Sequence, residues 1–152
     1  MNTQLQALSL WHNSLVSSVR CDAPDLTARQ MAMILSVYLN ADPCTVRGLA
    51  HELNISKPAV SRALDRLGEL GYIRRERDDL DRRNVLVQRT TAGGQFLDNF
   101  SKMILSAAAT TAEIPDSKQP SYALDAMIAT AAALDADGED KATQEWSSNV
   151  AA

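Results

Sequence analysis

The segment from Leu26 to Gly93 constrains the fold of this 152-residue chain more than any other part of it. Thr27 and Gln30 have the spacing of a capping box, which predicts a helix that begins at Ala28. Turn-forming residues end that helix at positions 40–43, and Thr45 is placed to cap a second, short helix. The buried face of the first of these helices is predicted to consist of Met31, Ile34, Leu35 and Tyr38.

A third helix is predicted directly after the second. Asn54 can take the left-handed conformation that ends one helix, and Ser56 is a strong N-cap for the next. Pro58 is tolerated because amides in the first helical turn have no intrahelical acceptor. Gly71 supplies the stop, and Tyr72 can pack back on the helix as in a Schellman motif. The inward-facing residues recur at helical spacing: Val60, Leu64 and Leu67.

After Tyr72 the apolar period changes from that of a helix to that of strands. Two short strands, at residues 72–77 and 84–90, flank a polar tip at 78–82, which is the pattern of a hairpin. Thr90 then caps a further helix. A scaffold helix, a short helix, a capped third helix and a hairpin, in this order, make a winged helix-turn-helix. The predicted fold is therefore mainly α, with a small β-hairpin wing.

Three apolar stripes of helical period lie outside residues 26–93, the segment called here the reader module. They are more than one small winged domain needs, so they are expected to form the interface of a homodimer. The chain then divides into a dimerisation helix at 1–25, the reader module at 26–93, dimerisation helices at 94–134 and an acidic, mobile tail at 135–152. The residues expected in the interface are Leu8, Trp11, Leu15, Phe96, Phe100, Met103, Ile104, Leu124 and Ile128.

Charge is distributed unevenly along the chain. The net charge is −4 overall, yet residues 45–94 hold ten Lys and Arg against seven Asp and Glu, and the remainder carries −7. Positive potential therefore lies on the reader module, where it can meet phosphate groups. Double-stranded DNA is the partner that this distribution favours.

Other chemistries find little support in the sequence. Cys21 and Cys44 have neither zinc-type spacing nor a disulfide framework, and no catalytic motif stands out. Cys21 has Asp22 and Asp25 beside it and only Arg20 to oppose them, which disfavours a reactive thiol. No metal, cofactor or catalytic site is indicated. Without a signal peptide or a bilayer-length apolar run, a cytoplasmic protein with no membrane association is expected.

Three local patterns resemble the MarR (multiple-antibiotic-resistance regulator) family of bacterial transcription factors. They are Leu26-Thr27-Ala28-Arg29-Gln30, Ser56-Lys57-Pro58-Ala59-Val60-Ser61-Arg62, and Asp81-Arg82-Arg83 followed by Thr90-Thr91-Ala92-Gly93. Their order and spacing over roughly residues 26–100 make the resemblance specific. It implies a two-fold dimer built from the terminal helices, DNA reading by the helix after Ser56, and a wing arginine, matching Arg83, in the minor groove. It also implies a response to a small effector. Arg89 and Gly94 depart from the family, which has an apolar residue and a larger residue there.

The side chains expected to meet DNA lie on the third helix and the wing. An arginine on a helix in the major groove can pair bidentately with guanine, so Arg62 and Arg66 are the candidate base readers or phosphate contacts. Asp81 is expected to orient the guanidinium of Arg83 by charge-assisted hydrogen bonds. An ordinary solvated face would explain the same charges. The full set is Ser56, Lys57, Pro58, Ser61, Arg62, Arg66, Arg77, Asp81, Arg82 and Arg83.

These observations predict a homodimeric, sequence-specific transcriptional regulator that binds a pseudo-palindromic operator. The family resemblance implies repression as the more frequent mode, and activation stays open. Two alternatives stay open. One is a winged-helix architectural or protein-interaction module without operator specificity, and the other is an enzyme of unrecognised type. The sequence does not identify the operator, the regulated genes or an effector.

Overall fold

The computed structural model describes residues 3–112, and the third apolar stripe with Leu124 and Ile128 lies outside them, as does the tail at 135–152. The chain divides into two compact units. One consists of Met1–His12 with Ala107–Ala152, and the other is Asn13–Ser106, which contains the whole reader module. The domain boundaries expected from the sequence remain a prediction.

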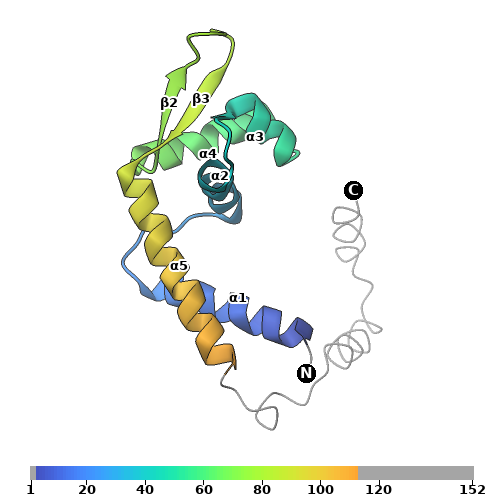
Figure 1. The fold of residues 1–152 in the computed structure, drawn as a ribbon, viewed down its shortest axis with the longest axis vertical. Coiled ribbons are helices and arrows are strands. Elements are labelled where there is room, and N and C mark those ends of the chain that lie inside the picture. Colours follow the sequence, from blue (N-terminus) through green and yellow to red (C-terminus); the bar gives the residue numbers. More distant parts are fainter. Residues whose placement is uncertain (1–2, 113–152) are drawn as a thin grey trace, which may run out of the picture. The chain divides into compact units, whose positions relative to one another are not determined.

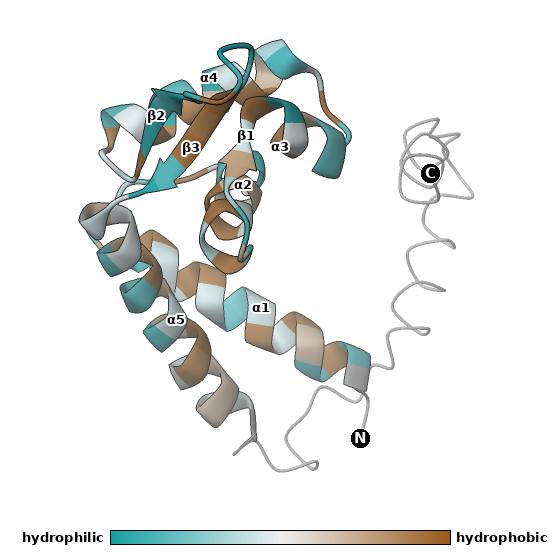
Figure 2. Ribbon diagram, turned by 45° about the horizontal axis from the view of Figure 1, so that its top comes forward, coloured by the Kyte–Doolittle hydropathy of each residue, from teal (hydrophilic) through white to brown (hydrophobic). Residues whose placement is uncertain are grey.

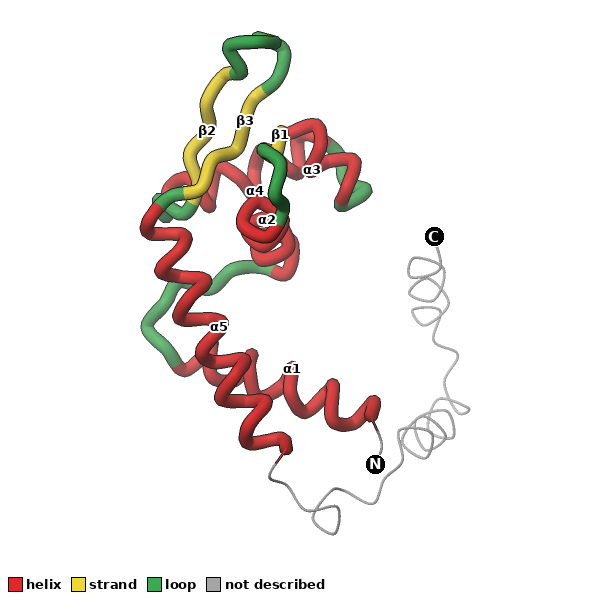
Figure 3. The backbone as a smooth tube through the Cα atoms, in the orientation of Figure 1, coloured by secondary structure: helices red, strands yellow, loops and turns green. Residues whose placement is uncertain are grey.

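The elements follow the order expected for a winged helix-turn-helix (Figures 1 and 3). Three strands form an antiparallel sheet in the order β1-β3-β2, and β2 and β3 are the wing. The predicted fold class, mainly α with a small hairpin, is confirmed. The bounds are α1 Thr3–Arg20, α2 Ala28–Leu39, β1 Cys44–Thr45, α3 Val46–Glu52, α4 Lys57–Glu69, β2 Ile73–Arg77, β3 Val85–Arg89 and α5 Thr91–Ala112.

Side-chain caps fix where most of these helices begin. Thr27 and Gln30 form the predicted capping box at the start of α2, with both reciprocal hydrogen bonds present. The Thr45 hydroxyl accepts the Gly48 amide at 2.9 Å and so caps α3. Ser56 occupies the predicted N-cap position of α4, but its side chain makes no capping hydrogen bond, so its expected role as a cap is wrong in that respect.

The predicted helix ends are confirmed. Asn54 has a φ of 49° and Gly71 a φ of 72°, so both take the left-handed conformation that ends a helix. The Tyr72 amide donates to the Leu67 carbonyl at 2.9 Å, which is the long hydrogen bond of a Schellman motif. The chain therefore turns sharply from α4 into the wing.

The core of the reader module lies where α2, α3, α4 and the sheet meet. Val60, Leu64 and Leu67 are buried as predicted, but the face assigned to α2 is partly wrong. Met33 and Val37 are buried there beside Ile34, whereas three predicted members are only half-buried: Met31, Leu35 and Tyr38. The reason is that α2 packs against both α4 and β3, so burial extends around the helix. The fully packed cluster is Met33, Ile34, Val37, Leu49, Val60, Ala63, Leu64, Leu67, Ile73 and Val87.

One strand was not predicted. β1 has only two residues, Cys44 and Thr45, which pair with Val87 and Leu86 of β3. A strand this short shows no apolar period in the sequence. Its pairing joins the start of α3 to the wing, so the helix-turn-helix and the hairpin form one packed unit.

The helices outside the reader module differ in how much of their apolar stripe is covered. On α1, Leu8, Trp11 and Leu15 are 51%, 53% and 42% exposed. On α5, Phe100 is only 6% exposed, while Phe96, Met103 and Ile104 are half-buried.

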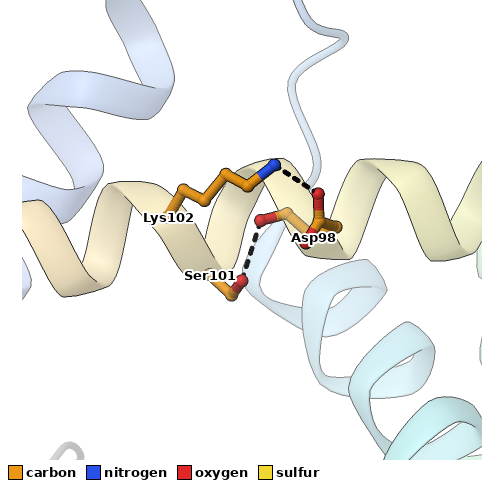
Figure 4. A network of polar contacts seen from close by, with 3 residues as sticks. All are labelled: Asp98, Ser101 and Lys102. Atoms are coloured by element: carbon orange, nitrogen blue, oxygen red, sulfur yellow. Dashed lines mark hydrogen bonds and ion pairs between the residues drawn. The ribbon is translucent and has the colours of Figure 1, made fainter.

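The polar face of α5 carries local contacts that are typical of a solvated helix surface. Lys102 Nζ lies 2.6 Å from Asp98 Oδ2, and the Ser101 hydroxyl donates to the Asp98 carbonyl (Figure 4). These groups are exposed and satisfy one another within one turn of the helix.

Candidate nucleic-acid interface

The helix-turn-helix is formed by α3, a short turn and α4. The Ile55 amide donates to the Ala50 carbonyl at 3.0 Å, and Ile55 itself packs against the core. The turn is therefore fixed from both sides, and α4 is held with one face against α2 and α3.

The outer face of α4 is polar along its whole length. The buried residues Val60, Leu64 and Leu67 occupy the inner face, so the polar side chains project away from the core. Pro58 lies in the first turn, where its missing amide is harmless. The side chains on or beside this outer face include Lys57, Ser61, Arg62, Asp65, Arg66 and Glu69.

The cations of α4 differ in whether they form an ion pair within the described residues. Arg66 Nη1 lies 3.3 Å from Glu69 Oε2 on the same helix. Within the described residues, neither Lys57 nor Arg62 forms an ion pair, and Arg62 is exposed. The Arg62 guanidinium therefore keeps its five donors available, whereas Arg66 has an intramolecular partner.

The register of the wing sorts its arginines onto two faces. Side chains alternate along a strand, so Arg75 and Arg77 share the face of the buried Ile73, which packs against α4. Arg75 forms an ion pair with Asp65 of α4 on that side. Arg74 lies on the opposite face and donates to Gln88 Oε1 at 2.7 Å. Figure 2 shows the contrast in hydropathy between the polar β2 and the apolar β3.

The tip of the wing is shaped by two aspartates. Asp78 Oδ1 accepts the Leu80 amide at 2.9 Å, and Asp81 Oδ1 accepts the Arg83 amide at 3.0 Å. Both are local side-chain-to-backbone bonds that stabilise turns. Asp81 was expected to hold the guanidinium of Arg83, and it holds the backbone amide instead. Its carboxylate orients the residue, but through the main chain.

The wing arginines beyond β2 are exposed. Arg82 and Arg83 make no ion pair within the part of the chain that the structure describes. Arg77 ends β2 on the α4 side of the sheet and is likewise exposed without an ion-pair partner there. Three cations of the wing are thus available to an external anion.

One further cation was missed by the sequence reasoning. Arg47 is exposed near the start of α3 and makes no ion pair within residues 3–112. The first helix of a helix-turn-helix crosses the DNA backbone, so an arginine early in it was the signal for a phosphate contact.

The electrostatics near the base of α4 involve Tyr72. Burial raises the pKa of the Tyr72 hydroxyl, with Arg66 acting in the opposite direction. Tyr72 therefore stays neutral at physiological pH, and its ring stacks on Phe96 with the centroids 4.7 Å apart. It is a packing residue at the wing base rather than a charged part of the interface.

The comparisons with known proteins match this geometry. The model of the MarR family matches residues 25–84. Residues 25–84 thus carry a winged helix-turn-helix of the MarR type. An uncharacterized HTH-type transcriptional regulator of Bacillus subtilis, YwhA, is 29% identical over 75 residues, which cover 47% of this chain and 54% of that protein. The chain thus spans about half the length of this curated relative.

Solved structures agree with the family fold. A mutant MarR from E. coli is 25% identical, with a TM-score of 0.56 and 88% of each chain covered. The structure of reduced AbfR bound to DNA is 22% identical, with a TM-score of 0.51, 66% of this chain covered and 69% of that one. The MarR family consists of transcriptional regulators, which favours a regulator over an enzyme of unrecognised type.

Membrane insertion and metal binding find no support in the part of the chain that the structure describes. No helix among residues 3–112 is long and apolar enough to cross a membrane. Within the same residues, no group of three or more His, Cys, Asp or Glu is placed to hold a metal ion.

Proposed function

We propose that this protein is a transcriptional regulator that binds a pseudo-palindromic DNA operator as a homodimer and represses by occluding a promoter. The observation that carries the proposal is the exposed Arg62, without an ion-pair partner among the described residues, on the outer face of an α4 whose inner face is buried. The likeness to AbfR, whose structure was solved on DNA, supports the DNA-binding part.

The proposal assigns base reading to Arg62. It lies early in α4, beyond the N-cap Ser56, and a recognition helix contacts base edges with its N-terminal residues. A guanidinium without an internal partner can pair bidentately with guanine O6 and N7. Arg66 lies one turn further on and is engaged by Glu69, so it is assigned to phosphate or to solvent. Ser56, Lys57 and Ser61 surround the helix N-terminus, which favours phosphate.

The wing is assigned to the minor groove. Arg83 follows the turn that Asp81 stabilises, and its side chain is exposed. Narrow, A·T-rich minor grooves attract arginine because their negative potential is enhanced. Arg77 and Arg82 are assigned to the sugar-phosphate backbone near that contact.

The homodimer in this proposal is supported by the exposed apolar stripe on α1. Trp11 and Leu15 keep 53% and 42% of their surface exposed, with Leu8 one turn before them. A row of large apolar side chains in water is unfavourable, and a second copy of the chain covers it in a closed two-fold dimer. The MarR family resemblance supports the same arrangement.

The proposal includes a small effector, and one place to test for it lies beside β3. An open pocket of about 340 Å³ lies between the end of α2 and β3, on the surface of the reader module. Its lining combines apolar side chains with Arg89 and Asp42. A ligand there would contact β3 and so affect the wing.

The proposal is tested by selecting bound sequences from genomic DNA and then measuring affinity over a salt series. We expect a few sharp sites with two inverted half-sites about one helical turn apart, and an affinity that falls steeply with salt. The alternative, an architectural module, predicts broad coverage without a motif. That outcome would reject operator-specific regulation.

A further inference from the structure

Tyr38, near the end of α2, connects three segments that are far apart in the sequence. Its hydroxyl accepts the Thr90 amide at 2.8 Å and faces the carbonyls of Tyr72 and Thr90 at 2.9 and 2.8 Å. Tyr72 follows the turn out of α4, and Thr90 lies between β3 and α5. The end of the recognition helix, the base of the wing and the start of α5 are thus held by one oxygen atom.

The backbone around the Tyr38 hydroxyl is so closely packed that no side chain fits at Gly93. A Cβ added to Gly93 would lie 2.2 Å from both the Tyr38 hydroxyl and the Tyr72 carbonyl. The Thr90 hydroxyl accepts the Gly93 amide at 3.1 Å and donates to the Gly71 carbonyl at 2.6 Å. The first turn of α5 is therefore seated directly on the turn between α4 and β2.

Arg89 adds a second tie at this junction. Its Nε donates to the Val37 carbonyl at 2.9 Å, and its Nη2 donates to the Asn40 carbonyl. These carbonyls lie at the end of α2, where backbone acceptors lack helical partners and a cation is favourable. The arginine that departs from the family pattern thus fastens the end of β3 to α2.

We propose that Tyr38 is a positioning residue that fixes the direction in which α5 leaves the reader module, and thereby the spacing of the two half-sites. This rests on the proposed function, in which the terminal helices join two copies. α5 runs unbroken from Thr91 to Ala112, so its first turn determines the course of the whole helix. One base pair of extra spacing moves a half-site by about 3.4 Å and rotates it by about 35°. With a rigid junction, the dimer should bind an operator of changed spacing more weakly. With a flexible junction, it should bind both spacings with similar affinity.

The test uses the full-length protein with Tyr38→Phe and with Ser36→Ala as the matched control. Both variants remove one hydroxyl from α2, but the Ser36 hydroxyl donates to Glu52 of α3 and not to the Tyr72 or Thr90 carbonyls that Tyr38 faces. Affinity is measured on the selected operator and on versions with one base pair added to or removed from the spacer, and on a single half-site.

For the wild type and for Ser36→Ala we expect a loss of roughly tenfold or more when the spacer changes by one base pair. For Tyr38→Phe the three spacings should differ by less than about threefold, while single half-site affinity stays equal to wild type. Amide exchange at Thr90 should become faster in Tyr38→Phe only, since that amide loses its acceptor. A destabilised fold would lower half-site affinity as well, which the proposal does not predict.

A second variant tests the same inference in case Tyr38→Phe fails to fold. Arg89→Gln removes the other tie without altering Tyr38, and it should relax the spacing preference in the same direction. Unchanged discrimination in both variants would overturn the inference while leaving the operator-binding function intact. A wild type that itself shows no preferred spacing would instead reject the proposed dimer on two half-sites.

Discussion

α4 and α1 are both amphipathic helices, yet only one of them has its apolar face covered. On α4, Val60, Leu64 and Leu67 are all 0% exposed. On α1, Leu8 and Trp11 are about half exposed, at 51% and 53%. Among the described residues, the reader module buries its apolar residues within its own chain, whereas α1 keeps large apolar side chains exposed. In the proposed homodimer, a second copy of the chain covers them.

The largest effect that would sharpen this comparison is expected in α4. Leu64→Ala removes a fully buried side chain and should destabilise the fold by about 2–5 kcal/mol. The matched change Leu8→Ala, on the exposed stripe, should leave the stability of the isolated monomer within about 0.5 kcal/mol. Urea unfolding at low protein concentration measures both. Equal losses in the free energy of unfolding would show that Leu8 is buried in the monomer as Leu64 is.

The next effect concerns assembly. Trp11→Asp should dissociate the dimer, because the charge would be buried at the interface without a partner. Sedimentation at micromolar concentration should then show a 16.5 kDa species with unchanged circular dichroism. Ser17→Asp is the matched control, since it adds the same charge to an exposed polar position of α1 and should leave the dimer intact. A Trp11→Asp protein that stays dimeric would place the interface elsewhere.

Within the reader module, Arg62→Ala should have the largest effect on DNA. If Arg62 reads guanine bidentately, the substitution should cost about 1–3 kcal/mol on the operator and less on scrambled DNA. The scrambled duplex, measured over the same salt series, is the control. Equal losses on both duplexes, with a shallower salt slope, would reduce Arg62 to a phosphate contact.

Arg83→Ala should weaken binding to a smaller extent and leave fold and dimer intact, since its side chain is exposed. Asp81→Ala should act in the same direction, because it removes the acceptor of the Arg83 amide. Fluorescence anisotropy on operators with A·T-rich or G·C-rich flanks measures the effect. Unchanged operator affinity in Arg83→Ala would reject the assignment of Arg83 to the minor groove.

The smallest effect is expected at Arg66. Its guanidinium pairs with Glu69, so a phosphate contact by Arg66 would be offset by the Glu69 carboxylate beside it, which repels phosphate. Arg66→Ala should therefore change operator affinity by less than about threefold. A loss as large as that of Arg62→Ala would mean that the ion pair opens on DNA.

Local chemistry made much of the reader module predictable from the sequence. Thr27 with Gln30, Thr45, Asn54 and Gly71 act through neighbours within a few residues, so their positions alone predicted the helix bounds. The order of elements then followed from the change of apolar period after Tyr72.

What could not be predicted depends on contacts over long sequence separations. The ion pair of Asp65 with Arg75 engages one cation of the wing, and it requires the wing to lie against α4. The hydrogen bond from Arg89 to the Val37 carbonyl joins residues 52 positions apart, so from the sequence this arginine was only a departure from the family pattern. The buried face of α2 was misjudged for the same reason, because two neighbours cover it.

The close packing around Gly93 also predicts which positions of this protein tolerate substitution during evolution. Any side chain at Gly93 would collide with main-chain atoms of the preceding turn, so no substitution elsewhere readily restores the site. Leu80, at the wing tip, is 98% exposed, and its replacement disturbs no packing. Saturation mutagenesis should therefore find that Gly93 tolerates no substitution, whereas Leu80, 13 positions earlier, tolerates most. New operator preferences can arise at the tip of the wing, while the base that carries it stays unchanged.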